Sequence, residues 1–192
     1  GDGELNCMHG AKGENTDKQQ YSEKLGKELE EAYQYIVGLD NYYLAGWPLF
    51  MSDTDCVPLS ALNADGKVFI HNELLDERKE FYRSLKESKR KKVFIGPKHL
   101  EDVVKFLNVD EFVEIPEIDS YSYKFDIKPE DNVIYMICGG MPAKVWMMNL
   151  LKQNKKITCI DFGSAFDPIF GWQTRTGQQS TEVLREYYKE LL

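Results

Sequence analysis

The sequence lacks the features of a membrane protein and of a disulfide-stabilised protein. No run approaches the ~20 consecutive apolar residues that a membrane-spanning helix needs. The four cysteines form no C-x-x-C pair, and two of them, Cys138 and Cys159, sit in apolar runs typical of buried strands. This usage is typical of a reducing compartment, where cysteine acts as a small hydrophobic residue. We therefore expect a cytoplasmic protein with no membrane span.

The sequence also has fewer positive than negative charges, and its histidines lack the spacing of metal ligands. The net charge is -8, so the chain as a whole repels nucleic acid and anionic membranes. An anionic substrate can still bind where a metal, a few basic groups or backbone N–H groups override this field. The basic run 86–92 is interpreted as a solvated helix C-terminus. His9, His71 and His99 lack zinc-ligand spacing, and we interpret them as surface or turn residues.

The sequence does contain a regular alternation of strand and helix patterns. Its 192 residues suffice for one domain with its own core. Apolar residues at helical spacing alternate with β-rich runs, and the run 132–138 is continuously apolar, as in a strand covered on both faces. The predicted strands are 41–45, 67–71, 93–96, 111–116, 132–138 and 156–161. This alternation predicts an α/β, Rossmann-like fold over 1–192, with a mostly parallel sheet and helices on both faces.

Three segments with unusual chemistry lie where strands of such a sheet would end, the edge at which ligands bind. The first is GDGEL at 1–5. Asp2 and Glu4 flank Gly3, and in a glycine turn the two carboxylates can meet at one point. Mg²⁺ and Mn²⁺ are held by one or two such carboxylates together with substrate phosphates. The carboxylates can instead accept ribose hydroxyls, and the spacing alone equally suits an ordinary acidic turn.

The second segment, ICGGMPAKV at 137–145, runs from a buried strand into a helix that begins at Pro142. Gly139 and Gly140 let a ligand approach the backbone, the helix N-terminus offers free N–H groups, and Lys144 adds a positive charge. A tight turn that merely needs glycine is the alternative. The spacing is not G-x-G-x-x-G, so the dinucleotide fingerprint is absent.

The third segment, at 159–175, reads CIDFGSAFDPIFGWQTR. Asp161 ends a buried strand, and Asp167 follows among aromatic residues. A carboxylate beside aromatic walls suits a general base over a sugar-sized pocket, whereas Asp-Pro also begins ordinary turns. Arg175 can hold a diphosphate or an acceptor carboxylate, or form a surface ion pair of little energetic value.

Together, and in this order, the three segments resemble the GT-D-type glycosyltransferases and their bacterial and viral relatives. GDGELNCMHG resembles the family's opening, which is usually preceded by arginine and an aromatic residue. ICGGMPAKVWMMNLL resembles its glycine turn and helix, and IDFGSAFDPIFGWQTR its aspartate-rich segment. The resemblance implies a first strand ahead of residue 1, and hence an N-terminally truncated sequence.

The resemblance also implies an activity. This family transfers a sugar from a nucleotide sugar, commonly UDP-linked, to a glycan or glycoconjugate acceptor with the help of Mn²⁺ or Mg²⁺. Asp2 and Glu4 match the Asp-x-Glu positions that serve the nucleotide and the metal, and Asp167 matches the region of the acidic base. We therefore expect an inverting hexosyltransferase. The residues expected around the nucleotide sugar are Asp2, Gly3, Glu4, Gly139, Gly140, Lys144, Asp161 and Arg175.

Two other functions remain open at this point. In an S-adenosylmethionine-dependent methyltransferase, the glycine loop would be 138–142 and Asp161 would take the ribose hydroxyls, although that loop usually follows the first strand of the fold. A non-catalytic nucleotide- or glycan-binding module would bind a ligand without turnover. Metal-dependent UDP binding with turnover distinguishes the glycosyltransferase from both.

Overall fold

The structure is a computed structural model that describes residues 2–15, 17–46, 64–65, 72–124, 126–172 and 178–192. Its helices are α1 (Asp2–Met8), α2 (Glu23–Val37), α4 (Leu75–Glu87), α5 (Val103–Leu107), α6 (Pro142–Gln153) and α7 (Thr181–Tyr187). Its strands are β1 (Ala45–Gly46), β2 (Ala64–Asp65), β3 (Lys92–Gly96), β4 (Glu111–Glu114), β5 (Ile134–Ile137) and β6 (Thr158–Asp161). No helix in the described ranges is long and apolar enough to cross a membrane.

A four-stranded parallel sheet forms the centre of the fold, in the order β4-β3-β5-β6. The two inner strands, β3 and β5, are buried along their whole length. Burial on both faces explains why these segments read as continuous apolar runs rather than as alternating patterns. The predicted parallel α/β, Rossmann-like sheet is confirmed.

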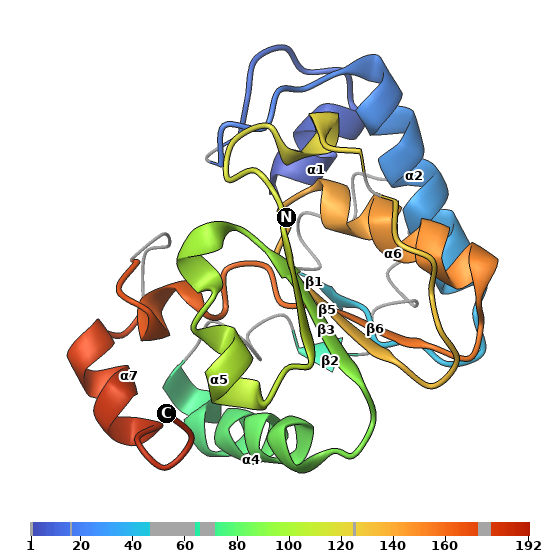
Figure 1. Ribbon diagram of the computed structural model, residues 1–192. Helices are drawn as coiled ribbons and strands as arrows, with labels where there is room; N and C mark the ends of the chain where they lie inside the picture. The colour runs from blue at the N-terminus through green and yellow to red at the C-terminus, as the bar shows by residue number, and fades with distance from the viewer. Residues whose placement is uncertain (1, 16, 47–63, 66–71, 125, 173–177) are drawn as a thin grey trace.

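Helices cover both faces of this sheet (Figure 1). On one face, α4, α5 and α7 pack on Phe94 and Met136, and an aromatic cluster around Tyr82 and Phe166 fills this core. On the other face, α6 packs on Ile95 and Ile137. The alternating side-chain directions of β3 and β5 thus supply both cores.

A third layer lies outside α6. Helix α2 packs along α6, and α1 packs against α2 (Figure 1). The buried positions of α2 include Leu25, Leu29 and Ile36, which recur at helical spacing and form one apolar stripe. The Ser22 hydroxyl accepts a hydrogen bond from the Leu25 N–H and caps this helix.

The predicted strands agree with the structure in the second half of the chain and less well in the first. The runs 93–96, 111–116, 132–138 and 156–161 correspond to β3, β4, β5 and β6. Within the predicted strand 41–45, however, only Ala45 is in a strand, and it pairs with Ala64 in a short two-stranded parallel ladder. The predicted strand at 67–71 lies outside the described residues.

Candidate functional site

The candidate site lies at the carboxyl edge of the sheet, beside a reversal in the path of the chain. The chain passes from β3 to β4 on one side, and then places β5 on the other side of β3. In open parallel sheets, ligands bind outside the carboxyl ends of the strands at such a reversal. The segments that follow β3 and β5 carry His99 and Gly139, and β6 ends at Asp161.

A buried ion cluster joins three elements at this edge. The Nζ atom of Lys144, in the first turn of α6, lies 2.8 Å from Oε1 of Glu4 in α1 and 2.7 Å from Oδ2 of Asp161. The side chains of Lys144, Glu4 and Asp161 are 17%, 9% and 19% exposed. The Lys144 ammonium also donates to the Gly140 carbonyl at 3.4 Å. Three residues that the sequence placed in three separate motifs are therefore in direct contact.

The mutual electrostatics of the cluster favour its charged forms. Burial acts to lower the pKa of Lys144, but the carboxylates of Asp161 and Glu4 raise it, and the resulting pKa lies well above the ordinary value. Burial by itself would raise the pKa of Glu4. The Lys144 ammonium lowers it, and the resulting pKa lies below the ordinary value. At neutral pH, Lys144 is therefore an ammonium held between two carboxyl groups.

A second group of side chains surrounds Asp167, which begins the short 3-10 helix η5 (Asp167–Ile169) and is 8% exposed. Its Oδ1 atom lies 3.7 Å from Nε2 of His99 in η3 (Lys98–Leu100), directly after β3. The Trp172 indole packs on the His99 ring with 4.7 Å between the ring centroids, and Trp172 is 45% exposed. A carboxylate and an imidazole thus lie next to a partly exposed aromatic ring.

His99 lies in the single 3-10 turn η3, in agreement with its interpretation as a turn residue, but it is not a surface residue. Its side chain is only 15% exposed, and Nδ1 lies 3.8 Å from the Glu117 carboxylate. Both ring nitrogens are buried, and neither has a hydrogen-bond partner among the described residues. Buried polar atoms normally have a partner, so these two nitrogens are an exception at this edge of the sheet. The feature of the sequence that could have identified His99 as a site residue is its position, three residues after a predicted strand.

Cys138 connects the two groups at the end of β5. Burial raises the pKa of the Cys138 thiol, and the negative charges of Asp167 and Asp161 raise it further. Both carboxylates therefore act on the same point of the sheet edge. The thiol stays protonated at neutral pH, which removes Cys138 as a thiolate nucleophile.

The two glycines after β5 are explained by packing and backbone conformation. A Cβ atom on Gly139 would lie 2.5 Å from Cζ3 of the buried Trp146, and Gly140 has a φ of +62°. The Gly139 carbonyl accepts a hydrogen bond from the Ser120 hydroxyl at 3.1 Å. Close packing and a left-handed turn thus require glycine here, and a role in ligand binding stays a prediction.

The expected glycine turn at the opening motif is wrong. Residues 2–8 form α1, so Gly3 lies inside a helix. The physical reason is apolar burial, because Leu5 and Cys7 are buried, and a Cβ on Gly26 of α2 would lie 2.6 Å from the Cys7 carbonyl oxygen. Gly3 itself faces the start of α6, where an added Cβ would lie 3.1 Å from Sδ of Met141.

The donors around Glu4 do not by themselves fit a divalent metal. Glu4 supplies one carboxylate, and its Oε1 already contacts the Lys144 ammonium. Within the described ranges, no three His, Cys, Asp or Glu side chains converge as a metal site requires. Neither the Asp2 side chain nor Arg175 belongs to the described part of the chain. A metal held by Asp2 and Glu4 stays a prediction.

The functional proposal for this chain rests on the arrangement of its side chains at the carboxyl edge of the sheet. Comparison with protein-family models, with curated proteins and with solved structures finds no match. The resemblance of the three motifs to GT-D-type glycosyltransferases therefore stays a prediction. The two side-chain groups at the carboxyl edge, one around Lys144 and one around Asp167, are the observations on which a function can be built.

Proposed function

We propose that the protein transfers a sugar from a nucleotide sugar to a hydroxyl of a glycan acceptor. One observation carries the proposal: Asp161 and Asp167, both from the third motif, lie at the carboxyl edge of the sheet, where Asp161 contacts Lys144 at 2.7 Å and Asp167 lies 3.7 Å from His99. The Lys144 cluster forms on the Asp161 side, and the His99 pair forms on the Asp167 side. A donor-binding group and a base are needed next to each other in a transferase.

The Lys144 cluster is suited to bind the nucleoside. Carboxylate oxygens can accept hydrogen bonds from ribose hydroxyls, and Glu4 and Asp161 supply such oxygens. Lys144 fixes both carboxylates through contacts of 2.8 and 2.7 Å, so it acts as a positioning residue. Arg175 is proposed to hold the diphosphate, as a planar guanidinium can.

Asp167 is proposed as the general base. Its carboxylate takes the proton of the acceptor hydroxyl while the acceptor oxygen forms a bond to the anomeric carbon. The bond from that carbon to the diphosphate breaks, and its electron pair leaves on the diphosphate oxygen. Attack opposite the leaving group inverts the anomeric carbon. His99, with Nε2 3.7 Å from Asp167, positions the carboxylate.

The metal requirement is proposed on the resemblance alone. A site at Glu4 would need the Asp2 carboxylate as a further donor and a shift of Lys144 away from Oε1. When bound, Mn²⁺ or Mg²⁺ would neutralise charge on the diphosphate. The steps above use only the side chains of this chain, and titration with Mn²⁺ and with EDTA tests the requirement separately.

The central experiment measures nucleotide release. Purified protein is incubated with a panel of nucleotide sugars and glycan acceptors, with and without Mn²⁺, and free nucleotide is quantified. Asp167→Asn should reduce transfer by about 100-fold or more and leave nucleotide binding within about twofold. Asp40→Asn, an exposed position in the chain, is the matched control and should be unaffected. Full transfer by Asp167→Asn would show that the base is another residue.

The same panel decides between functions. Ligands that bind the native state raise the midpoint of thermal unfolding. A midpoint that rises with UDP or a UDP-sugar supports the proposal, whereas a rise with S-adenosylmethionine alone supports the methyltransferase. If nucleotide sugars bind but no combination of donor and acceptor releases free nucleotide, the protein is a binding module and the proposed transfer is overturned.

His99 offers a second test of the Asp167 group. His99→Asn removes the imidazole next to Asp167, and we expect kcat to fall by about tenfold while KM for the nucleotide sugar stays unchanged. A purely structural role would instead lower the unfolding midpoint and alter both constants. An unchanged kcat would remove His99 from the proposed mechanism.

A further inference from the structure

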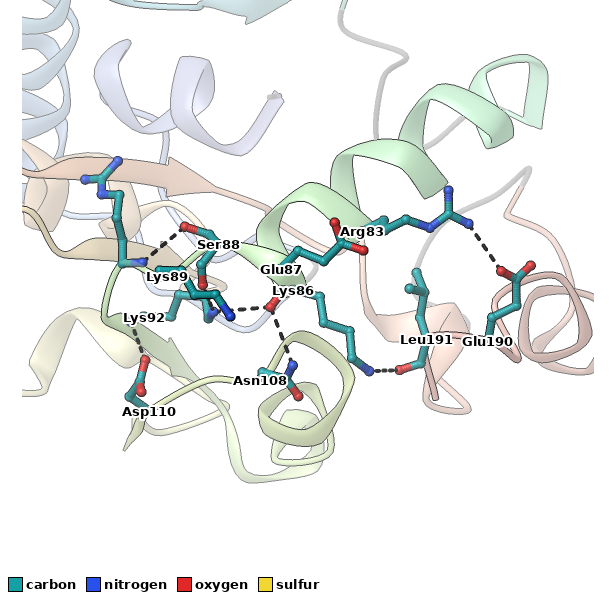
Figure 2. Close-up of a pocket in the computed structure, with 11 residues that line it drawn as sticks. Arg83, Lys86, Glu87, Ser88, Lys89, Lys92, Asn108, Asp110, Glu190 and Leu191 are labelled. Atoms are coloured by element: carbon teal, nitrogen blue, oxygen red, sulfur yellow. Dashed lines mark hydrogen bonds and ion pairs between the residues drawn. The ribbon is translucent and has the colours of Figure 1, made fainter.

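A cavity of about 610 Å³ lies at the opposite, amino edge of the sheet (Figure 2). The end of α4 and the turn into β3 form one wall, the loop before β4 forms another, and Glu190 and Leu191 close it from the C-terminal segment. The volume falls in the range of small-molecule pockets. None of its lining residues belongs to the candidate site at the carboxyl edge.

The lining of this cavity is rich in positive charge, although the chain has a net charge of -8. Five cationic side chains meet three carboxylates, a local balance of about +2 before pairing. The cations are Arg83, Lys86, Lys89, Arg90 and Lys92, and the carboxylates are Glu87, Asp110 and Glu190. A local excess of this kind can hold an anion against the overall field of an acidic protein.

Two of the lysines bind backbone oxygens and have no carboxylate partner among the described residues. Lys92 is 3% exposed, and its Nζ donates to the Ser88 carbonyl at 2.9 Å (Figure 2). The Lys86 ammonium donates to the Leu191 carbonyl at 2.5 Å. A carbonyl oxygen satisfies a donor but carries no net charge, so neither ammonium forms an ion pair with a carboxylate within the described residues.

Two further cations show the same feature. The Arg90 guanidinium donates to the carbonyls of Asn132 at 2.9 Å and Val133 at 3.2 Å. Lys89 is exposed and has no hydrogen bond or ion pair within the described part of the chain. Arg83, by contrast, pairs with Glu190 at 3.2 Å. Among the residues that the structure describes, four of the five cations thus form no ion pair with a carboxylate.

The surroundings of Lys86 also disfavour its positive charge. Burial lowers the pKa of Lys86, and the positive charge of Lys105 lowers it further. An anion placed among these groups would oppose both effects with its negative charge, because it would stabilise the charged ammonium.

We propose that this cavity binds a small, multiply charged anion that carries phosphoryl groups, at a site separate from the carboxyl edge. Its concave shape and charge suit a compact ligand. An extended nucleic acid is less suitable, because Glu87 and Asp110 interrupt the basic surface that a phosphate backbone would follow. The proposal does not depend on the proposed sugar transfer.

The test uses pyrophosphate as the probe, in isothermal titration calorimetry at constant ionic strength. Lys89→Gln removes a cation that has no described internal partner and should weaken binding about fivefold. Glu87→Gln removes a repelling carboxylate and should tighten binding about two- to fivefold. Lys155→Gln is the control, an exposed lysine in the turn before β6 and outside the cavity, and should change affinity by less than about twofold. Circular dichroism and thermal unfolding check that all variants fold.

We expect the affinity for pyrophosphate to fall in Lys89→Gln, to rise in Glu87→Gln and to stay nearly unchanged in Lys155→Gln. Equal affinity in all three, or a loss in Lys155→Gln as large as that in Lys89→Gln, would overturn the proposal, because the anion would then bind elsewhere or respond to net charge alone. Absence of pyrophosphate binding would overturn it as well. Binding of a single-stranded oligonucleotide but not of pyrophosphate, with the same dependence on Lys89, would replace it with a nucleic-acid site.

Discussion

Replacement of Lys144 by methionine tests the ion cluster directly. Methionine keeps much of the apolar stem but removes the ammonium that contacts Glu4 and Asp161. Removing one partner of a buried ion pair costs about 3–5 kcal/mol, because the remaining charge stays buried without compensation. Lys144 is 17% exposed and Glu4 is 9% exposed, so this range applies. Part of the cost is relieved if the carboxyls take up protons.

Urea denaturation followed by circular dichroism measures the loss. With a urea dependence of about 3 kcal/mol per molar, the upper end for small proteins, the midpoint should fall by about 1 M or more. The matched control is Lys152→Met in the same helix, which removes an exposed pair with Glu31. Exposed pairs contribute about 0–1 kcal/mol. A loss in Lys144→Met no larger than that in Lys152→Met would refute the reasoning.

The pH dependence gives a second readout. The pKa of Glu4 is lowered in the folded protein, so its contribution is present above the unfolded pKa of about 4.3 and is lost as pH falls through the folded value. In Lys144→Met the lysine charge is gone, and burial should raise the pKa of Glu4 instead. Protonation then stabilises the variant relative to wild type, and the stability difference should shrink between pH 7 and pH 4. A difference that grows on acidification would contradict this.

Three smaller predictions concern packing and a buried hydroxyl. Gly139→Ala should destabilise by about 1–3 kcal/mol, because its Cβ would meet Trp146 at 2.5 Å. At Gly10, φ is +75° and nothing lies within 4 Å of an added Cβ, so Gly10→Ala should cost only the left-handed backbone energy of about 1–2 kcal/mol. A loss of stability in urea denaturation that is larger for Gly10→Ala than for Gly139→Ala would refute the packing argument. Tyr82→Phe should be neutral or slightly stabilising in the same assay, because the buried hydroxyl has no hydrogen-bond partner in the described part of the chain.

The apolar runs in the second half of the sequence were sufficient to identify the four strands of the central sheet. The apolar run 133–138 contains β5, which is buried on both faces. Ser180 directly precedes α7, and its hydroxyl accepts a hydrogen bond from the Val183 N–H and caps that helix. Such local signals succeed because hydrophobic period and capping chemistry depend on neighbours in the sequence.

The first segment shows where local reasoning fails. The pattern GDGE suggests a turn, since glycine and aspartate are frequent in turns. In the structure, burial of Leu5 and Cys7 makes the segment helical. Tertiary packing overrides local preference here because Cys7 packs on apolar residues of α2 and α6, which are not its neighbours in the sequence.

By itself, the sequence determined the parallel α/β fold and the residue types that gather at the carboxyl edge, because strand periodicity and strand ends are local properties. Only the tertiary structure decided how these residues combine. It placed Lys144 between Glu4 and Asp161, and it brought His99 to Asp167 from 68 positions earlier in the chain. Ion pairs and ring contacts of this kind depend on distances between segments far apart in the sequence, and such distances are set by packing of the two cores.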